Sequence, residues 1–190
     1  MSERIQNVKQ KEWNGIKFRS TLEADTAKNL DGMGIEYKYE ERKIILQEAF
    51  YSPYQKDKVR YISYTPDFEV GNIIIECKGF ETPEWKIKKK LLFKWLQENE
   101  PNTCFYQIKN SKKDLLNVLD KYWQVLGLAV EVTSKPSRKV QPVPKLYDSI
   151  EQATKELHIA YKPKTSIMKS LTGEKEYVYG YHWKLKKIKL

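Results

Sequence analysis

The chain has few of the residues that cross-link small domains or bind zinc. Its only cysteines are Cys77 and Cys104, and its only histidines are His158 and His182, all far apart in a sequence of 190 residues. Neither a disulfide framework nor a zinc site with the usual Cys/His spacing is therefore expected. Any bound metal ion would have to be held by oxygen ligands.

Long apolar runs are also missing. No stretch approaches the roughly 20 apolar residues of a membrane span, and the N-terminal residues MSERIQNVKQKEW lack the apolar segment of a signal peptide. The sequence therefore predicts a cytoplasmic protein with no membrane partner.

Positive charge and aromatic side chains are abundant instead. The formal net charge is +10, the pI is about 9.3, and aromatic residues make up 13% of the chain. A basic chain favours a polyanionic partner such as nucleic acid or an acidic membrane surface. The apolar and aromatic content is too high for a disordered chain, so we expect one folded domain of ordinary size with a small appendage.

The order of the expected elements indicates the fold class. A helix is expected over residues 20–33, with Ser20 as its N-cap and Gly34 at its end. Strands are expected at 35–46, 60–64, 68–70, 73–75, 104–108 and 128–132, and further helices at 84–97 and 112–126. This order predicts an α/β domain with a central mixed sheet flanked by helices.

Residues 133–145 have the composition of a linker. The segment TSKPSRKVQPVPK contains three prolines, four basic residues and no apolar periodicity. The predicted organisation is therefore a first domain over 1–132, a basic proline-rich linker over 133–145, and a small helical module over 146–190 with short helices at 149–157 and 165–171.

The strongest chemical pattern is Pro66-Asp67 followed by Ile73-Ile-Ile-Glu76-Cys-Lys78-Gly79. Because strand side chains alternate, Glu76 and Lys78 share one face, and a tight turn lets Asp67 lie opposite Glu76. Two carboxylates suit a hard divalent cation. A nearby ammonium group can orient water and stabilise the charge that builds on a phosphate during hydrolysis. The alternative is a turn aspartate beside a solvated strand face with a cross-strand ion pair.

Glu23 has two interpretations. In Ser20-Thr-Leu-Glu23 it matches the capping box that begins many helices. It is also in register with Ala27 and Leu30, at the edge of the core-facing stripe, where a carboxylate without a partner would be costly. A metal ion would relieve that cost, so both interpretations stay open.

Four short motifs occur together within residues 14–125. They are Phe18-Arg-Ser-Thr-Leu-Glu23, Gly34-Ile-Glu-Tyr-Lys-Tyr-Glu40, Tyr64-Thr-Pro-Asp67-Phe and Ile75-Glu76-Cys-Lys78-Gly79. Together they resemble the bacteriophage endonuclease I group of PD-(D/E)xK nucleases.

That resemblance implies a restriction-endonuclease-like core with an active site made of Glu23, Asp67, Glu76 and Lys78. The first three would hold Mg²⁺, for which Mn²⁺ can substitute. It also implies DNA as the partner, and often a homodimer that cuts both strands or resolves branched DNA. Two departures stand out: the family has an acidic residue where this chain has Lys38, although Glu40 follows on the same strand face, and an extra loop covers about 49–58.

The C-terminal residues resemble a second group. The segments Leu146-Tyr-Asp-Ser-Ile-Glu-Gln-Ala-Thr-Lys-Glu-Leu, Leu171-Thr-Gly and Gly180-Tyr-His-Trp183-Lys are similar to the modular helix-turn-helix of intron-encoded and phage homing nucleases. The second helix of such a module reads DNA. The expected DNA contacts are Lys162, Lys164, Ser166, Lys169, Ser170 and Lys184. The alternative is a helical hairpin that only packs on the nuclease domain, with Trp183 as its anchor.

Three functional hypotheses follow. The main one is a magnesium-dependent DNA endonuclease whose C-terminal module supplies site preference, as in homing or site-specific phage nucleases. The second is an endonuclease that resolves DNA junctions by recognising their shape. The third is a non-catalytic DNA-binding protein that has kept a nuclease fold.

Overall fold

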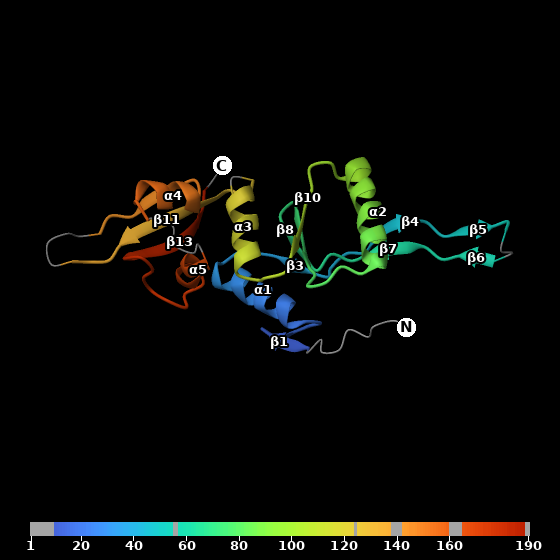
Figure 1. The fold of residues 1–190 in the computed structure, drawn as a ribbon, viewed down its shortest axis with the longest axis horizontal. Coiled ribbons are helices and arrows are strands. Elements are labelled where there is room, and N and C mark those ends of the chain that lie inside the picture. The colour runs from blue at the N-terminus through green and yellow to red at the C-terminus, as the bar shows by residue number, and fades with distance from the viewer. Residues whose placement is uncertain (1–9, 55–56, 124, 138–141, 160–164, 189–190) are drawn as a thin grey trace. The chain divides into compact units, whose positions relative to one another are not determined.

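The computed structural model describes residues 10–54, 57–123, 125–137, 142–159 and 165–188 (Figure 1). The chain forms two compact units, which we call the central unit (Tyr37–Lys109) and the discontinuous unit (Met1–Glu36 with Asn110–Leu190). The described residues form several small sheets and five helices, which confirms the predicted mixed α/β class. None of the helices in these ranges is long and apolar enough to span a bilayer.

The central unit contains a four-stranded sheet in the order β10-β9-β8-β3. Its strands are β3 (Lys38–Tyr39), β8 (Phe68–Val70), β9 (Ile73–Cys77) and β10 (Cys104–Ile108). Strand β10 runs parallel to β9, whereas the β9/β8 and β8/β3 pairs are antiparallel. The sheet is therefore mixed, as predicted, and β9 is buried at every residue.

Helix α2 (Pro83–Asn99) links β9 to β10 and covers one face of this sheet. Thr82 caps its first turn, because the Thr82 hydroxyl accepts a hydrogen bond from the Trp85 N–H at 3.2 Å. An apolar cluster joins the helix to the strands through Ile44, Tyr64, Ile74, Trp85, Leu92 and Leu96. Because Ile74 belongs to this cluster, α2 covers the face of β9 that also carries Glu76.

The extra loop expected at 49–58 is instead part of a two-stranded arm. Strand β4 (Ile44–Gln47) pairs with β7 (Ile62–Tyr64), and β5 (Phe50–Ser52) pairs with β6 (Asp57–Val59). The pairing of Gln47 with Ile62 continues in the same register to the pairing of Phe50 with Val59. The register shifts only between Ile45 and Gln47. The four strands therefore make one long antiparallel ribbon, visible as the extended hairpin in Figure 1.

The first described elements of the discontinuous unit form an antiparallel hairpin of β1 (Lys11–Trp13) and β2 (Ile16–Phe18), which was not predicted. Asn14 and Gly15 form its turn with φ values of 50° and 77°. Two positive φ angles in succession are what a two-residue hairpin turn of type I′ requires, so the Asn-Gly pair was the available signal. Helix α1 (Thr21–Gly32) follows, with Ser20 as its N-cap as predicted.

The C-terminal part of this unit is built on a second sheet. Its elements are α3 (Lys113–Tyr122), β11 (Leu128–Ser134), β12 (Lys145–Tyr147), α4 (Ile150–Glu156), α5 (Thr165–Leu171) and β13 (Tyr181–Lys187). The two short helices lie where they were predicted, but β11 is the middle strand between β12 and β13. The last predicted strand of the first domain, β11, therefore pairs with strands from the predicted C-terminal module.

Candidate active site

Asp67 and Glu76 lie side by side where β8 begins and β9 ends. The antiparallel register pairs Phe68 with Ile75, and one further step sets Asp67 opposite Glu76. The Cys77 N–H donates a hydrogen bond of 2.7 Å to Asp67 Oδ2, which holds the Asp67 side chain against the end of β9. Two carboxylates are thus brought together on neighbouring strands, as the strand alternation predicted.

Glu76 is buried, with only 5% of its surface exposed. Its Oε2 atom accepts a hydrogen bond of 2.8 Å from the hydroxyl of Tyr64, at the base of the arm. Burial, followed by the negative charge of Glu76, raises the pKa of Tyr64 far above its ordinary value. Tyr64 therefore stays protonated and remains a hydrogen-bond donor to Glu76.

Lys78 follows directly after β9 and lies beside the first turn of α2. Its N–H donates to the carbonyl oxygen of Ile108 at 3.0 Å, so the chain stays in register with β10 here. The Lys78 ammonium lies 5.1 Å from the centre of the Trp85 ring, a cation–π distance. The ring therefore helps to place the ammonium on the same face as Glu76.

A further polar residue lies beside Glu76 in the sheet. Gln107 of β10 is the register partner of Glu76, and its Oε1 accepts hydrogen bonds from Trp85 Nε1 at 3.1 Å and from Lys89 Nζ at 3.3 Å. Lys89 also pairs with Glu81. Neither Gln107 nor Tyr64 was predicted: Gln107 joins the site through the pairing of β10 with β9, and Tyr64 joins it through a side-chain hydrogen bond from a strand that pairs elsewhere.

Glu40 lies next to Asp67, at the end of β3. Its N–H donates to the carbonyl oxygen of Asp67 at 3.2 Å, one step beyond the β3–β8 pairs, and its φ is 50°. Lys38 is largely exposed, and its Nζ lies 3.5 Å from Glu41. The backbone of Glu40, rather than that of Lys38, is therefore the neighbour of Asp67.

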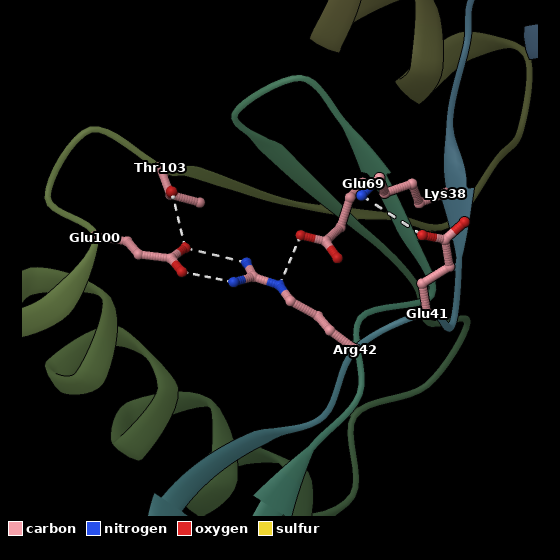
Figure 2. A network of polar contacts seen from close by, with 6 residues as sticks. All are labelled: Lys38, Glu41, Arg42, Glu69, Glu100 and Thr103. Carbon is pink, nitrogen blue, oxygen red and sulfur yellow. Dashed lines mark hydrogen bonds and ion pairs between the residues drawn. The ribbon is translucent and has the colours of Figure 1, made fainter.

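Arg42 ties three segments of the central unit together (Figure 2). Its Nη1 and Nη2 donate to the two carboxylate oxygens of Glu100 at 2.5 and 3.0 Å, and its Nε lies 2.8 Å from Glu69 Oε1. The hydrogen bond to Glu100 is the main cause that raises the pKa of Arg42, and the same contact lowers the pKa of Glu100. Arg42 thus links the segment before β4 to β8 and to the C-terminal end of α2.

Glu23 makes helix-capping contacts, which correspond to one of its two interpretations. The Glu23 N–H donates to Ser20 Oγ at 3.2 Å, the Ser20 hydroxyl donates to Glu23 Oε1 at 2.7 Å, and the Arg19 N–H donates to Oε2 at 3.0 Å. The side chain is buried, with 5% exposed. Of the four predicted catalytic residues, Asp67, Glu76 and Lys78 come together in the central unit, whereas Glu23 belongs to the discontinuous unit.

Asp67 and Glu76 are the oxygen ligands that this part of the central unit offers to a metal ion. Within the described ranges, no group of three or more His, Cys, Asp or Glu side chains is arranged to hold a metal. Mg²⁺ in phosphoryl-transfer sites takes only one or two carboxylates, because it keeps several waters and takes other oxygens from the substrate phosphate. The pair Asp67 and Glu76 is such a donor set.

The residues expected to contact DNA in the C-terminal part differ in their surroundings. Lys162 and Lys164 lie outside the described residues. Ser170 is buried, where its hydroxyl donates to the Glu176 carbonyl at 3.2 Å and accepts the Trp183 N–H at 3.0 Å. Trp183 is 1% exposed and packs inside this part of the unit. Ser166, Lys169 and Lys184 are partly or fully exposed.

Comparison with known proteins identifies a family that this chain matches. The model of one family, described as phage endonuclease I, matches residues 4–115. The matched range is more than half of the chain and contains Glu23, Asp67, Glu76 and Lys78, and it ends before β11. No curated protein and no solved structure matched the chain.

Proposed function

The chain belongs to the phage endonuclease I family, which implies an endonuclease acting on DNA, and from this premise we propose a metal-dependent PD-(D/E)xK active site. The observation that carries the proposal is the pairing of Asp67 with Glu76 across β8 and β9, with Lys78 two residues farther along. These are the groups that phosphodiester hydrolysis needs: oxygen ligands for a cation, and a positive charge close to the phosphate.

In this proposal Asp67 and Glu76 hold Mg²⁺ or Mn²⁺ next to the scissile phosphate. The ion, when bound, neutralises the charge that develops on the phosphate oxygens. The Cys77 N–H orients Asp67, and the Tyr64 hydroxyl orients Glu76. Both supports come from the sheet or the buried cluster, so the two carboxylates are fixed before the substrate binds.

Lys78 is proposed to position the attacking water and to stabilise the developing negative charge. An ammonium group is a compact point charge with three donors, which suits contacts to both a water and a phosphate oxygen. The Trp85 ring and the attachment of Lys78 to the end of β9 limit where this ammonium can lie. Trp85 is accordingly a positioning residue.

Glu23 is proposed as a third acidic residue of the site on the strength of the family resemblance. Its described contacts are those of a capping box. The two roles are compatible in principle, since a carboxylate has about four lone-pair sites and can accept from donors while contacting a cation.

The DNA substrate has two candidates. Site preference would come from the C-terminal part of the chain, through Lys162, Lys164, Ser166, Lys169 and Lys184. Ser170, also expected as a contact, is buried, and its hydroxyl is occupied by the Glu176 carbonyl and the Trp183 N–H. A branched junction is the second candidate, and membership of the phage endonuclease I family favours it.

The test compares supercoiled plasmid, linear duplex and four-way junction as substrates, each with and without Mg²⁺. Endonuclease function predicts Mg²⁺-dependent conversion of the plasmid. Cuts at a fixed sequence in linear duplex would favour site preference, whereas cuts only near the branch would favour junction resolution. A protein that binds all three DNAs and cuts none of them would instead be non-catalytic.

A further inference from the structure

The two-stranded arm of the central unit exposes an unusual number of aromatic side chains. Tyr54 is 95% exposed, Tyr51 70% and Phe50 48%, and Tyr61 nearer the base is also exposed. Large apolar groups gathered on one exposed element mark an interaction surface more often than chance placement. An isolated two-stranded ribbon is also marginally stable in water, so a partner would stabilise it.

One face of the arm combines an aromatic ring with positive charge. Residues alternate between the faces of the ribbon, and the register pairs Tyr51 with Lys58. Ala49 and Arg60 continue that face by one pair, so Tyr51, Lys58 and Arg60 lie together on it. Among the described residues of the arm, the charged side chains on this face are the cations Lys58 and Arg60, and both are exposed, as is Tyr51.

We propose that this face of the arm is a DNA-binding surface that contacts duplex DNA flanking the cleaved bond. The inference rests on the proposed function, because it takes the DNA to be held at Asp67 and Glu76. A two-stranded β-ribbon has the width that the major groove of B-DNA admits. Lys58 and Arg60 would contact phosphates, and Tyr51 would contact phosphate or base edges.

The charge pattern makes a second copy of the chain a less favourable partner than DNA for this face of the arm. A two-fold contact between identical arms brings the same surface together on both sides. It would place Lys58 and Arg60 against their own counterparts, and like charges across an interface are costly. DNA instead supplies a regular array of negative charge.

The attachment of the arm fixes how far from the cut it acts. Its base strand β7 ends at Tyr64, whose hydroxyl contacts Glu76. From Tyr64 back to Lys58, a strand rising about 3.3 Å per residue covers about 20 Å. Duplex DNA rises about 3.4 Å per base pair, so the contact lies within about six base pairs of the cleaved phosphate.

The test is a triple substitution, Tyr51→Ala with Lys58→Ala and Arg60→Ala, set against Glu48→Ala with Phe50→Ala on the opposite face of the same arm. All proteins carry Glu76→Gln, so that the DNA stays uncut during binding. The triple variant should bind linear duplex at least about tenfold more weakly, and the slope of log K against log salt should fall by roughly 0.9 for each lost phosphate contact. The opposite-face variant should bind like its parent.

A hydroxyl-radical footprint on the same DNA locates the contact. The triple variant should lose protection within about six base pairs of the cut and keep it at the cut itself. Equal affinity, salt slope and footprint in the triple variant and its parent would overturn the inference while leaving the proposed active site standing. Loss of a dimer in sedimentation, with the footprint unchanged, would overturn it in favour of a protein interface. If the unsubstituted chain neither binds nor cuts DNA, the proposed function itself fails.

Discussion

Glu23 is the residue whose two proposed roles can be separated most cleanly. Glutamine at the N3 position also completes a capping box, so Glu23→Gln should keep the unfolding free energy within about 0.5 kcal/mol. If the Glu23 carboxylate contributes to the metal site, the same variant should cut DNA at least about 10²-fold more slowly. Urea unfolding and single-turnover cleavage on one preparation measure both quantities.

The comparison variant for this prediction is Glu23→Ala. It removes the cap as well as the charge, and should lose about 1 kcal/mol of stability in addition to activity. Wild-type cleavage by Glu23→Gln would show that Glu23 is only a cap, and the active site would then consist of central-unit residues.

At the scale of single residues, the sequence predicts those site residues whose positions depend only on residues close to them along the chain. Asp67, Glu76 and Lys78 are linked by strand alternation and one tight turn, and the structure places them as the alternation requires. Tyr64 and Gln107 were not predicted. Gln107 lies beside Glu76 through the register of β10 on β9, for which a single sequence carries no direct signal. The Tyr64 contact is a side-chain hydrogen bond that depends on the tertiary fold.

At the scale of elements, the expected loop at 49–58 is the clearest wrong prediction. Phe50 and Tyr51 are adjacent aromatics and Pro53 follows closely, so no clean alternation marks a strand there. The strand expected over 35–46 is likewise divided into β3 and β4, and Glu40 between them has a φ of 50°. A left-handed residue within a strand-like run is set by tertiary contacts rather than by local pattern.

The contact between Arg42 and α2 predicts a pH-dependent stability. The guanidinium lowers the pKa of Glu100 below its ordinary value of 4.5. The contribution of this ion pair to the free energy of unfolding is therefore fully present above pH 4.5. It is lost as the pH falls through the folded-state pKa of Glu100, because the Glu100 carboxyl of the unfolded chain binds a proton at higher pH than that of the folded chain. Glu100→Gln should lose about 1 to 2 kcal/mol at neutral pH, and much less than that at pH below the folded-state pKa.

Urea unfolding of Glu100→Gln and the unsubstituted chain, across the acid range, measures this difference. The matched control is Glu98→Gln on the same helix, whose carboxylate is exposed and 3.8 Å from Lys94. That control should follow the unsubstituted chain at every pH. A stability gap for Glu100→Gln that is the same at neutral and acid pH would contradict the assignment.

At the scale of the whole molecule, the linker composition of 133–145 suggests that a chain ending near Lys135 would keep a folded nuclease domain. The structure predicts the opposite for the discontinuous unit. Strand β11 pairs with β13 over its whole length, and a Cβ at Gly32 of α1 would lie 3.1 Å from the Thr172 backbone just after α5. Truncation would expose the buried side chains Leu128, Val130 and Val132 of β11.

The truncated chain should therefore lose more than about 3 kcal/mol of stability, through the removal of packed core residues. Limited proteolysis and tryptophan fluorescence measure this loss of stability, since Trp123, the C-cap residue of α3, is buried and reports on unfolding. A truncated protein with the same unfolding midpoint and the same cleavage rate would show that the C-terminal part is a separable module, as the linker composition suggested.

The central claim is that Asp67 and Glu76 hold a metal ion for DNA cleavage, and the most direct measurement compares Asp67→Asn and Glu76→Gln with the unsubstituted chain on supercoiled plasmid. Cleavage should stop in chelator, return with Mg²⁺ or Mn²⁺, and be poorly supported by Ca²⁺, whose looser coordination misplaces the water. Each variant should cut at least about 10²-fold more slowly while binding DNA nearly as well, because a metal ligand rather than a phosphate contact is removed. Full cleavage in chelator, or wild-type rates in either variant, would contradict the account.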